Sequence, residues 1–442
     1  MTNAERPASG DCASLARMGL SGRARAIWAL YANRRMLAIF GMGIASGLPL
    51  LLTTGTLSYW LAKSGVDKTA IGLFALVGLP YSFKFVWAPA LDHVRIPGLG
   101  ARLGQRRSWA LVAQLALVAC ILGLGATDPA HAPWATARLA VALAFFSATQ
   151  DIAIDAYRIE VLADSEQGAG AAATQTGYRI GLLLAGAGAI ALADFAPWRA
   201  VFAALAAVMG VGIASVLLAP SPPALARATG DDSWSALLER ALVAPLRDFT
   251  LRPLWVAILA FAMLYKFGDA VAGVMANKFY VDLGFSGVEI ASVTKVLGLA
   301  ASIGGVLVGG ILVAQLGIYR ALALGGLLQV PSLLLFAFAA RLGHDRGGLA
   351  LAVGADSFSS GVAGAALVAY LSGLCRGAFT ATQYALLTSL MAAGRTGLAS
   401  GAGWLAAQLD WASFFSVTAL LAAPGLLLLL WIWRATRARV AG

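Results

Sequence analysis

The sequence is poor in charged residues, and this shortage already decides the class of protein. Only 12% of its 442 residues are charged, while 60% are hydrophobic. A soluble domain usually carries about a quarter charged residues and fewer than half apolar ones. Because so few charges cannot cover a surface in water, most of the surface must face lipid. The composition therefore excludes an ordinary soluble protein of two or three domains.

Cysteine and histidine are also scarce, and the few that occur are far apart. They are Cys12, Cys120, Cys375, His93, His131 and His344. An odd number of scattered cysteines argues against a disulfide framework or a Cys-x-x-Cys metal site. All three histidines fall in predicted loops, and no two share a helical face. We therefore expect no metal, no cofactor and no histidine proton relay inside a membrane.

Long apolar runs make up most of the chain after an Arg-rich beginning. Residues 1–35 hold six arginines and no apolar core, so we expect no cleavable signal peptide there. A helix needs about 20 mostly apolar residues to cross a membrane. Twelve such spans are predicted, at 36–58, 70–91, 108–126, 135–157, 171–193, 199–219, 253–276, 288–313, 320–340, 352–373, 380–407 and 412–433.

The distribution of basic residues orients these spans. One side, which includes both termini and the polar stretch 220–252, carries 20 of the 32 lysines and arginines, and the other side carries 7. Basic loops lie in the cytoplasm, so both termini are predicted to be cytoplasmic. This topology accounts for most of the net charge of +11, and we expect no nucleic-acid partner. The remaining five basic residues lie inside spans.

The chain reads as a duplication. Gly65 and Ile71 recur as Gly284 and Ile290, and Trp198 and Phe202 recur as Trp411 and Phe415. Six spans at 36–219 and six at 253–433 are joined by a linker at 220–252 with a short interfacial helix near 235–243, and a basic tail follows at 434–442. Two six-helix halves in parallel repeat are typical of the major facilitator fold. We predict an all-α polytopic membrane protein with twelve helices in this arrangement.

A charge cluster is expected on the cytoplasmic side after the second span. Asp92 ends that span, and Arg106 and Arg107 follow fourteen and fifteen residues later. This resembles the Asp- and Arg-containing loop of the facilitator superfamily, although the spacing is stretched and a glycine is missing. In the second half, Arg320 is present but Ala314 stands where an Asp would be expected. We predict that Asp92, Arg106 and Arg107 favour one state of the transporter; the alternative is ordinary loop charge.

Charged residues inside the predicted spans are the candidates for transport chemistry. A charge at the middle of a membrane costs about 2.5–3.5 kcal/mol on insertion scales, so each should face a cavity or a partner. Carboxylates that change protonation can carry a proton, and the candidates are Asp151, Asp155 and Asp269. Fixed cations can bind an acidic solute, and the candidates are Lys84, Arg179, Lys266, Lys295 and Arg395. Asp356 lies close to the predicted start of its span, so we assign it a structural role.

Other side chains are expected to contribute to substrate binding. Tyr81 and Tyr178 can stack on sugars, and Gln150 precedes the Asp151–Asp155 pair. The alternatives are that membrane aromatics are interfacial anchors and that the charges only pair between or within helices. In particular, Lys266 and Asp269 are three residues apart, so they can neutralise each other.

Several segments resemble the AmpG-type muropeptide permeases, in the peptide and acetyl-CoA transporter branch of the major facilitator superfamily. They are SGLPLLLTTGTLSYWL (46–61), IGLFALVGLPYSFKFVWAPALD (71–92), FFSATQDIAIDAYRIEVL (145–162), LYKFGDA (264–270), VTKVLGL (293–299) and ATQYALLTSLMAAGR (381–395). The resemblance implies a monomeric permease of the Gram-negative inner membrane. It would import N-acetylglucosaminyl-anhydro-N-acetylmuramyl peptides from periplasm to cytoplasm with protons, for cell-wall recycling and β-lactamase induction.

Two alternatives remain at this stage. An acetyl-CoA-like or other anionic-solute permease of the same branch would share the segment QDIAIDA (150–156). A polytopic membrane enzyme is a different class, for which the Asp151–Asp155 pair lacks a metal-binding partner or a nucleophile. We therefore expect a secondary transporter, not an enzyme.

Overall fold

The computed structural model describes residues 31–66, 77–221, 243–286, 289–290, 292–375, 379–399 and 401–441. All secondary structure in these ranges is helical. Ten of the described helical segments are long and apolar enough to cross a membrane. They are Arg34–Leu61, Gln105–Ala126, Pro133–Val161, Asp164–Ala193, Trp198–Leu218, Trp255–Ala276, Ser292–Leu316, Ile318–Leu342, Arg346–Leu374 and Trp411–Arg437.

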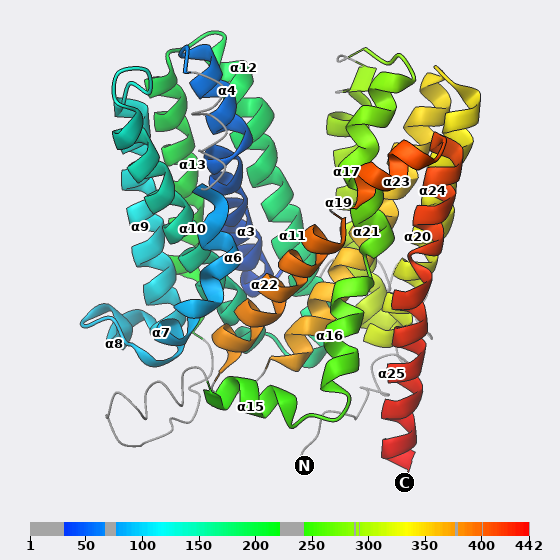
Figure 1. Ribbon diagram of the computed structural model, residues 1–442. Helices are drawn as coiled ribbons and strands as arrows, with labels where there is room; N and C mark the ends of the chain where they lie inside the picture. Colours follow the sequence, from blue (N-terminus) through cyan, green and yellow to red (C-terminus); the bar gives the residue numbers. More distant parts are fainter. Residues whose placement is uncertain are drawn as a thin grey trace.

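The helices form two groups that stand side by side (Figure 1). The N-terminal half contains α3 (Arg34–Thr53), α4 (Gly55–Lys63), α6 (Leu79–Phe83), η2 (Lys84–Val86), α7 (Ala88–His93), α8 (Leu99–Leu103), α9 (Gln105–Ala126), α10 (Pro133–Val161), α11 (Gln167–Leu183), the π-helix η4 (Leu184–Gly188), α12 (Ala189–Ala193) and α13 (Trp198–Leu218). The C-terminal half contains α16 (Trp255–Leu264), α17 (Phe267–Asp282), the π-helix η6 (Ser292–Leu297), α19 (Gly298–Leu316), α20 (Ile318–Leu342), α21 (Arg346–Leu374), α22 (Thr380–Ala399), α23 (Ala402–Gln408), α24 (Trp411–Leu420) and α25 (Ala423–Ala441). The short helix α15 (Ala244–Thr250) lies at the same end of the molecule as α7, α8 and the C-terminus (Figure 1).

The predicted spans at 70–91 and 380–407 are not among these ten segments, because the described residues form shorter helices there. In the first, α6, η2 and α7 follow one another as short pieces, and residues 67–76 lie outside the described ranges. Proline occupies the first turn of both α6 and α7, where its missing N–H does no harm but prevents continuation from the preceding helix. In the second, α22 ends at Ala399 and α23 begins at Ala402.

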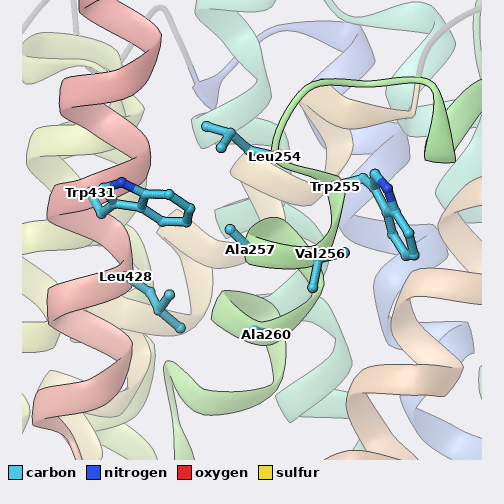
Figure 2. Close-up of a pocket in the computed structure, with 7 residues that line it drawn as sticks. All are labelled: Leu254, Trp255, Val256, Ala257, Ala260, Leu428 and Trp431. Carbon is cyan, nitrogen blue, oxygen red and sulfur yellow. The ribbon is translucent and has the colours of Figure 1, made fainter.

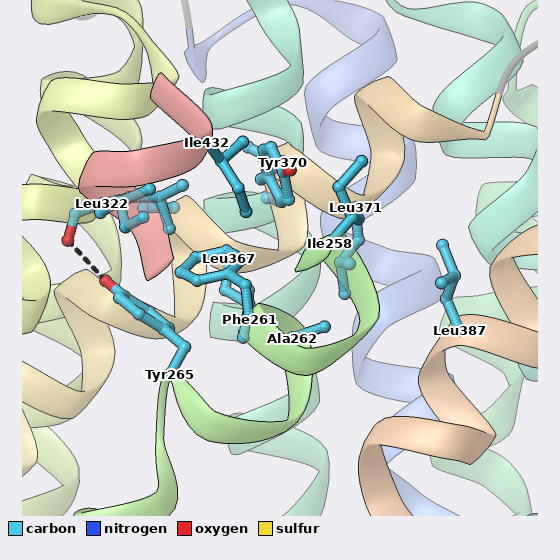
Figure 3. Close-up of a cluster of buried hydrophobic side chains, with 14 of the residues drawn as sticks. Ile258, Phe261, Ala262, Tyr265, Leu322, Leu367, Tyr370, Leu371, Leu387 and Ile432 are labelled. Atoms are coloured by element: carbon cyan, nitrogen blue, oxygen red, sulfur yellow. Dashed lines mark hydrogen bonds between the residues drawn. The ribbon is translucent and has the colours of Figure 1, made fainter. Parts of the chain in front are cut away.

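Each half has hydrophobic clusters of its own. In the C-terminal half, Phe261 packs edge-to-face on Tyr370, and the hydroxyl of Tyr265 donates a 2.7 Å hydrogen bond to the carbonyl of Leu322 (Figure 3). A mixed cluster joins Ala381 and Ala385 of α22 to residues of the N-terminal half. Two further clusters also contain residues of both halves, since Ile159 and Ala171 belong to the cluster of Phe261, and Ala172 packs with Val306 and Ala365. The halves are therefore packed against each other in this conformation.

Glycine allows helices within each half to approach closely. A side-chain carbon at Gly47 of α3 would lie 2.0 Å from the backbone oxygen of Tyr178 in α11. In the other half, the same atom at Gly305 of α19 would lie 2.1 Å from the oxygen of Phe358 in α21. Small residues bring helices together in this way when water supplies no driving force. Of these helices, α11 carries Arg179 and α21 carries Asp356, which are described next.

Candidate substrate and proton site

A buried ionic cluster lies at a break between two helices of the C-terminal half. Lys266 stands between α16 and α17, and its Nζ atom lies 3.0 Å from Oδ2 of Asp269. The ammonium group also donates a 2.6 Å hydrogen bond to Oγ of Ser360 in α21, whose hydroxyl in turn lies 3.1 Å from Asp269 Oδ2. The break thus aims a cation and a carboxylate at α21, and the predicted pairing of Lys266 with Asp269 is formed.

Asp356 belongs to this cluster, contrary to the structural role that the sequence analysis assigned to it. The helix α21 begins at Arg346, so Asp356 lies ten residues inside it instead of near its start. It precedes Ser360 by one turn on the same helical face, and its carboxyl group contacts that of Asp269. The spacing of Asp356 and Ser360 was a usable signal, but the span was predicted to begin too late.

Arg179 brings the N-terminal half to the same cluster. It lies in α11, and the charge of its guanidinium group interacts with that of Asp269 across the two halves. Its Nε atom is buried and has no hydrogen-bond partner among the described residues. Tyr178 is the preceding residue and also interacts with Arg179. A cation held in this way is available to a negatively charged solute between the halves.

A second carboxylate site lies within the N-terminal half. Asp151 of α10 accepts a hydrogen bond from the hydroxyl of Ser46 in α3, and its charge interacts with that of Lys84 in η2. The hydroxyl of Tyr81 in α6 is buried beside Ser147 of α10 and interacts with Asp151. The interrupted span therefore places Lys84 and Tyr81 against α10, and their role in substrate binding stays a prediction.

Asp155 and Gln150 occupy different surroundings from Asp151. Asp155 lies 3.5 Å from the guanidinium group of Arg158 on its own helix, and Arg158 lies over the ring of Tyr384 in the other half, 5.6 Å from its centroid. Gln150 is completely buried and donates a 3.1 Å hydrogen bond to the carbonyl of Ala45 in α3. In this conformation Gln150 joins two helices, and its role in substrate binding stays a prediction. The side chains of Lys295 and Arg395 lie outside the described residues.

A charge cluster connects the halves at the end of the molecule where α7, α15 and the C-terminus lie (Figure 1). Arg106 lies 2.7 Å from Asp92 and 2.7 Å from Glu160. Asp92 also accepts hydrogen bonds from the backbone N–H groups of Ala381 (3.2 Å) and Thr382 (2.9 Å) at the start of α22 in the opposite half. A carboxylate is favourable at a helix N-terminus because the unpaired N–H groups and the helix dipole are positive there. We call Asp92, Arg106 and Glu160 the cytoplasmic cluster, after the side of the membrane on which the sequence predicts it.

The composition of this cluster differs partly from the prediction. Arg107 does not contact Asp92 but donates hydrogen bonds to the carbonyls of Leu103 and Ala219. Glu160 completes the cluster instead of Arg107, since it is the second carboxylate that pairs with Arg106. It was visible in the sequence as a charge at the cytoplasmic end of α10, but only the packing of α9 on α10 brings it to Arg106.

A polar network at the other end of the bundle stays within the C-terminal half. Glu289 accepts hydrogen bonds from the side chain and backbone of Ser286 and from Arg346, and it contacts His344. These hydrogen bonds, chiefly from Ser286, lower the pKa of Glu289 to about 2. The network ties together the segments before η6 and α21 without contacting the other half.

The described surface also has an apolar groove of about 450 Å³ between α16 and α25 (Figure 2). It is lined by Leu254, Trp255, Val256, Ala257, Ala260, Leu428 and Trp431. An acidic solute needs polar groups to orient it, and none of these side chains is ionisable. The groove is therefore not the candidate solute site.

Known proteins agree with this arrangement. The profile of the Major Facilitator Superfamily matches residues 36–403. The anhydromuropeptide permease of Escherichia coli (strain K12) is 39% identical over 403 residues, covering 91% of this chain and 80% of the relative. The transporter AmpG 4 of Rickettsia felis is 34% identical over 91% of this chain and 97% of its own length.

The chain belongs to the anhydromuropeptide permease family of the major facilitator superfamily. The family resemblance predicted from the sequence is thereby confirmed, and the chain is a multi-pass membrane transporter, not an enzyme. The fold of these permeases is shared with the proton:xylose symporter XylE (TM-score 0.65, 14% identity, 91% of this chain and 95% of the other). The human organic anion transporter TETRAN is similar in fold as well (TM-score 0.63, 18% identity, 90% and 98%).

Proposed function

We propose that this permease imports anhydromuropeptides from periplasm to cytoplasm, driven by the proton gradient. The observation that carries the proposal is the 39% identity with the Escherichia coli permease over 91% of the chain. The protein would then reside in the bacterial inner membrane with both termini in the cytoplasm, recycle cell-wall fragments and supply the signal for β-lactamase induction.

The cations near the middle of the bundle are proposed to bind the acidic peptide of the substrate. Arg179 supports this best, because it faces the cluster of the opposite half without a hydrogen-bond partner for Nε among the described residues. Lys84 and Lys266 provide one further cation in each half. We assign the sugar part to Tyr81 and Tyr178, and we keep Gln150, Lys295 and Arg395 as proposed contributors.

Proton coupling is proposed to use Asp151, Asp155 and Asp269. A buried carboxylate can alternate between charged and neutral forms when a neighbouring cation moves. Asp151 has a hydroxyl partner and a cation on a separate helix, whereas Asp155 and Asp269 each have a cation nearby on their own segment. Rocking of the halves would therefore change the cation near Asp151, whereas Asp155 and Asp269 would keep the cation on their own segment.

The cytoplasmic cluster is proposed to stabilise an outward-facing state. Hydrogen bonds between the halves are made by Asp92 at α22 and by Tyr31, whose hydroxyl donates to the carbonyl of Leu307 (3.2 Å). Loss of these contacts would open the cytoplasmic end. The substrate path would then alternate between the two sides of the membrane.

Uptake by the purified protein in proteoliposomes tests the proposed function. Labelled anhydromuropeptide should accumulate when an inward proton gradient is imposed and should equilibrate only when a protonophore is added. Labelled acetyl-CoA in the same vesicles tests the alternative substrate. Accumulation of acetyl-CoA but not of anhydromuropeptide, or uptake that ignores the gradient, would contradict the proposal.

A further inference from the structure

We infer that Asp356 and Asp269 form a carboxyl pair that binds one transported proton, with Arg179 of the opposite half controlling its release. This inference deepens the proposed proton coupling and rests on it. It adds a proton-binding residue in α21 and a route by which an anionic solute and the proton influence each other.

The hydrogen bonds of the cluster point to a proton between the two carboxyl groups. Oδ2 of Asp269 is occupied by Lys266 (3.0 Å) and Ser360 (3.1 Å). Asp356 contacts Asp269 from the turn before Ser360, and its Oδ1 atom is buried without a hydrogen-bond partner among the described residues. Two ionised carboxylates cannot share so small a buried space, whereas a protonated one donates a hydrogen bond to the other.

The charges around the pair decide when it holds this proton. Lys266 balances one carboxylate, and Tyr280 of α17 brings a neutral hydroxyl that interacts with Asp356. The second balancing cation is Arg179, which belongs to the other half. The charge of the pair therefore depends on how closely α11 approaches α17 and on what else binds Arg179.

Because of this dependence, binding of the solute and binding of the proton are coupled. When a carboxylate of the solute binds Arg179, the positive charge that offsets the second aspartate is neutralised, and the pair takes up a proton from periplasmic water. When the solute leaves, Arg179 again faces the pair, and the proton passes from the Asp356 carboxyl group to cytoplasmic water. Solute and proton thus strengthen each other's binding, and by linkage the effect is reciprocal.

Replacing Asp356 by asparagine tests proton coupling separately from solute binding. The amide of Asp356→Asn can still donate a hydrogen bond to Asp269, but it cannot release a proton. In proteoliposomes we expect gradient-driven accumulation to fall to the level of the protonophore-treated wild type, while exchange of labelled for unlabelled solute continues. Asp356→Glu should restore part of the accumulation. Asp282→Asn is the matched control, since Asp282 ends α17 in an exposed ion pair with Lys278.

Infrared spectroscopy provides a second measurement that needs no transport. With anhydromuropeptide bound, wild type and Asp282→Asn should show the C=O stretch of a protonated carboxylic acid at neutral pH, and Asp356→Asn should lose this component. Asp269→Asn should lose it too, because Asp356 can then ionise beside Lys266; this variant serves if Asp356→Asn does not fold. An unchanged band in these variants, or full accumulation by Asp356→Asn, would overturn the inference. A wild type without gradient-driven uptake would instead contradict the proposed function, and the infrared result would still decide the proton site.

Discussion

The two halves of this permease hold their buried carboxylates in different ways. In the N-terminal half, Asp151 has a hydroxyl partner on α3 and a cation, Lys84, on an interrupted span. In the C-terminal half, Asp269 has Lys266 and Ser360 as direct partners and Asp356 beside them. The first site depends on where η2 lies, whereas the second carries its own compensating cation.

The surroundings of η2 show why this difference matters. The segments α6, η2 and α7 pack against α22 of the opposite half. A movement of the halves therefore moves the support of Lys84, while Lys266 and Asp269 move together. The two sites therefore depend on the relative position of the halves in different ways, the first through the support of Lys84 and the second through Arg179 of the opposite half.

The largest expected effect is at Asp151, whose neighbouring cation lies on a different helix. Asp151→Asn keeps a hydrogen-bonding partner for Ser46 but carries no proton, so we expect gradient-driven uptake to be abolished while exchange is partly retained. Asp155→Asn is expected to have the same effect. Uptake measured with and without a gradient decides this, and full gradient-driven uptake by both variants would remove them as proton carriers.

Breaking the cytoplasmic cluster should lower the population of the outward-facing state that it is proposed to stabilise. Asp92→Asn removes the charge that pairs with Arg106 and faces the start of α22. The loss of a helix cap alone costs about 0.5–2 kcal/mol, and breaking a buried ion pair adds to it. We expect the cytoplasmic ends to separate, which distances between spin labels on α8 and α15 would report.

The neighbouring arginine supplies the control for this experiment. Arg107→Gln alters a residue next to Arg106 that contacts carbonyls instead of Asp92, so the distances should stay as in the wild type. If both variants open the cytoplasmic end equally, general loosening of the loop explains the effect and the role of Asp92 is refuted.

Most of the fold could be predicted because each span is a separate apolar run. Hydrophobic length alone predicted a span in each of the ten segments that can cross a membrane. It missed the interruption at 79–93, although Pro80 and Pro89 mark the two helix starts, because apolar residues continue across it. The short helices of the spans predicted at 70–91 and 380–407 contact each other between the halves, since α6, η2 and α7 pack against α22. Contacts with another helix there replace continuous hydrogen bonding within one helix.

The site was predictable only where its parts are close in sequence. Lys266 and Asp269 are three residues apart, and their pairing was expected. The contacts of Asp269 with Ser360 and of Asp92 with α22 join residues separated by 91 and by 289 or more positions. Such contacts depend on how helices cross, which neither composition nor periodicity specifies. For the same reason, the sequence did not reveal the contact of Asp356 with Asp269.

Removing the cation of Arg179 should weaken binding of the acidic solute in addition to disturbing proton coupling. Arg179→Ala is expected to weaken binding of the acidic substrate by roughly tenfold or more, since hydrogen bonds to charged groups contribute about 1.5–3 kcal/mol. Isothermal titration with anhydromuropeptide measures this, and an analogue with amidated carboxyl groups should bind both proteins equally. Unchanged affinity for the acidic form would mean that Arg179 only serves as a structural ion pair.

The smallest expected effect concerns Glu289, whose network lies wholly within the C-terminal half. Its pKa is lowered from about 4.3 in an unfolded chain to about 2, so ionised Glu289 stabilises the fold above the higher value. This contribution is lost as the pH falls from the higher value through the lower one. Glu289→Gln should therefore melt slightly below the wild type at neutral pH, with the difference shrinking as the pH falls below about 4. A difference that is constant with pH would show that packing, not charge, joins these two segments.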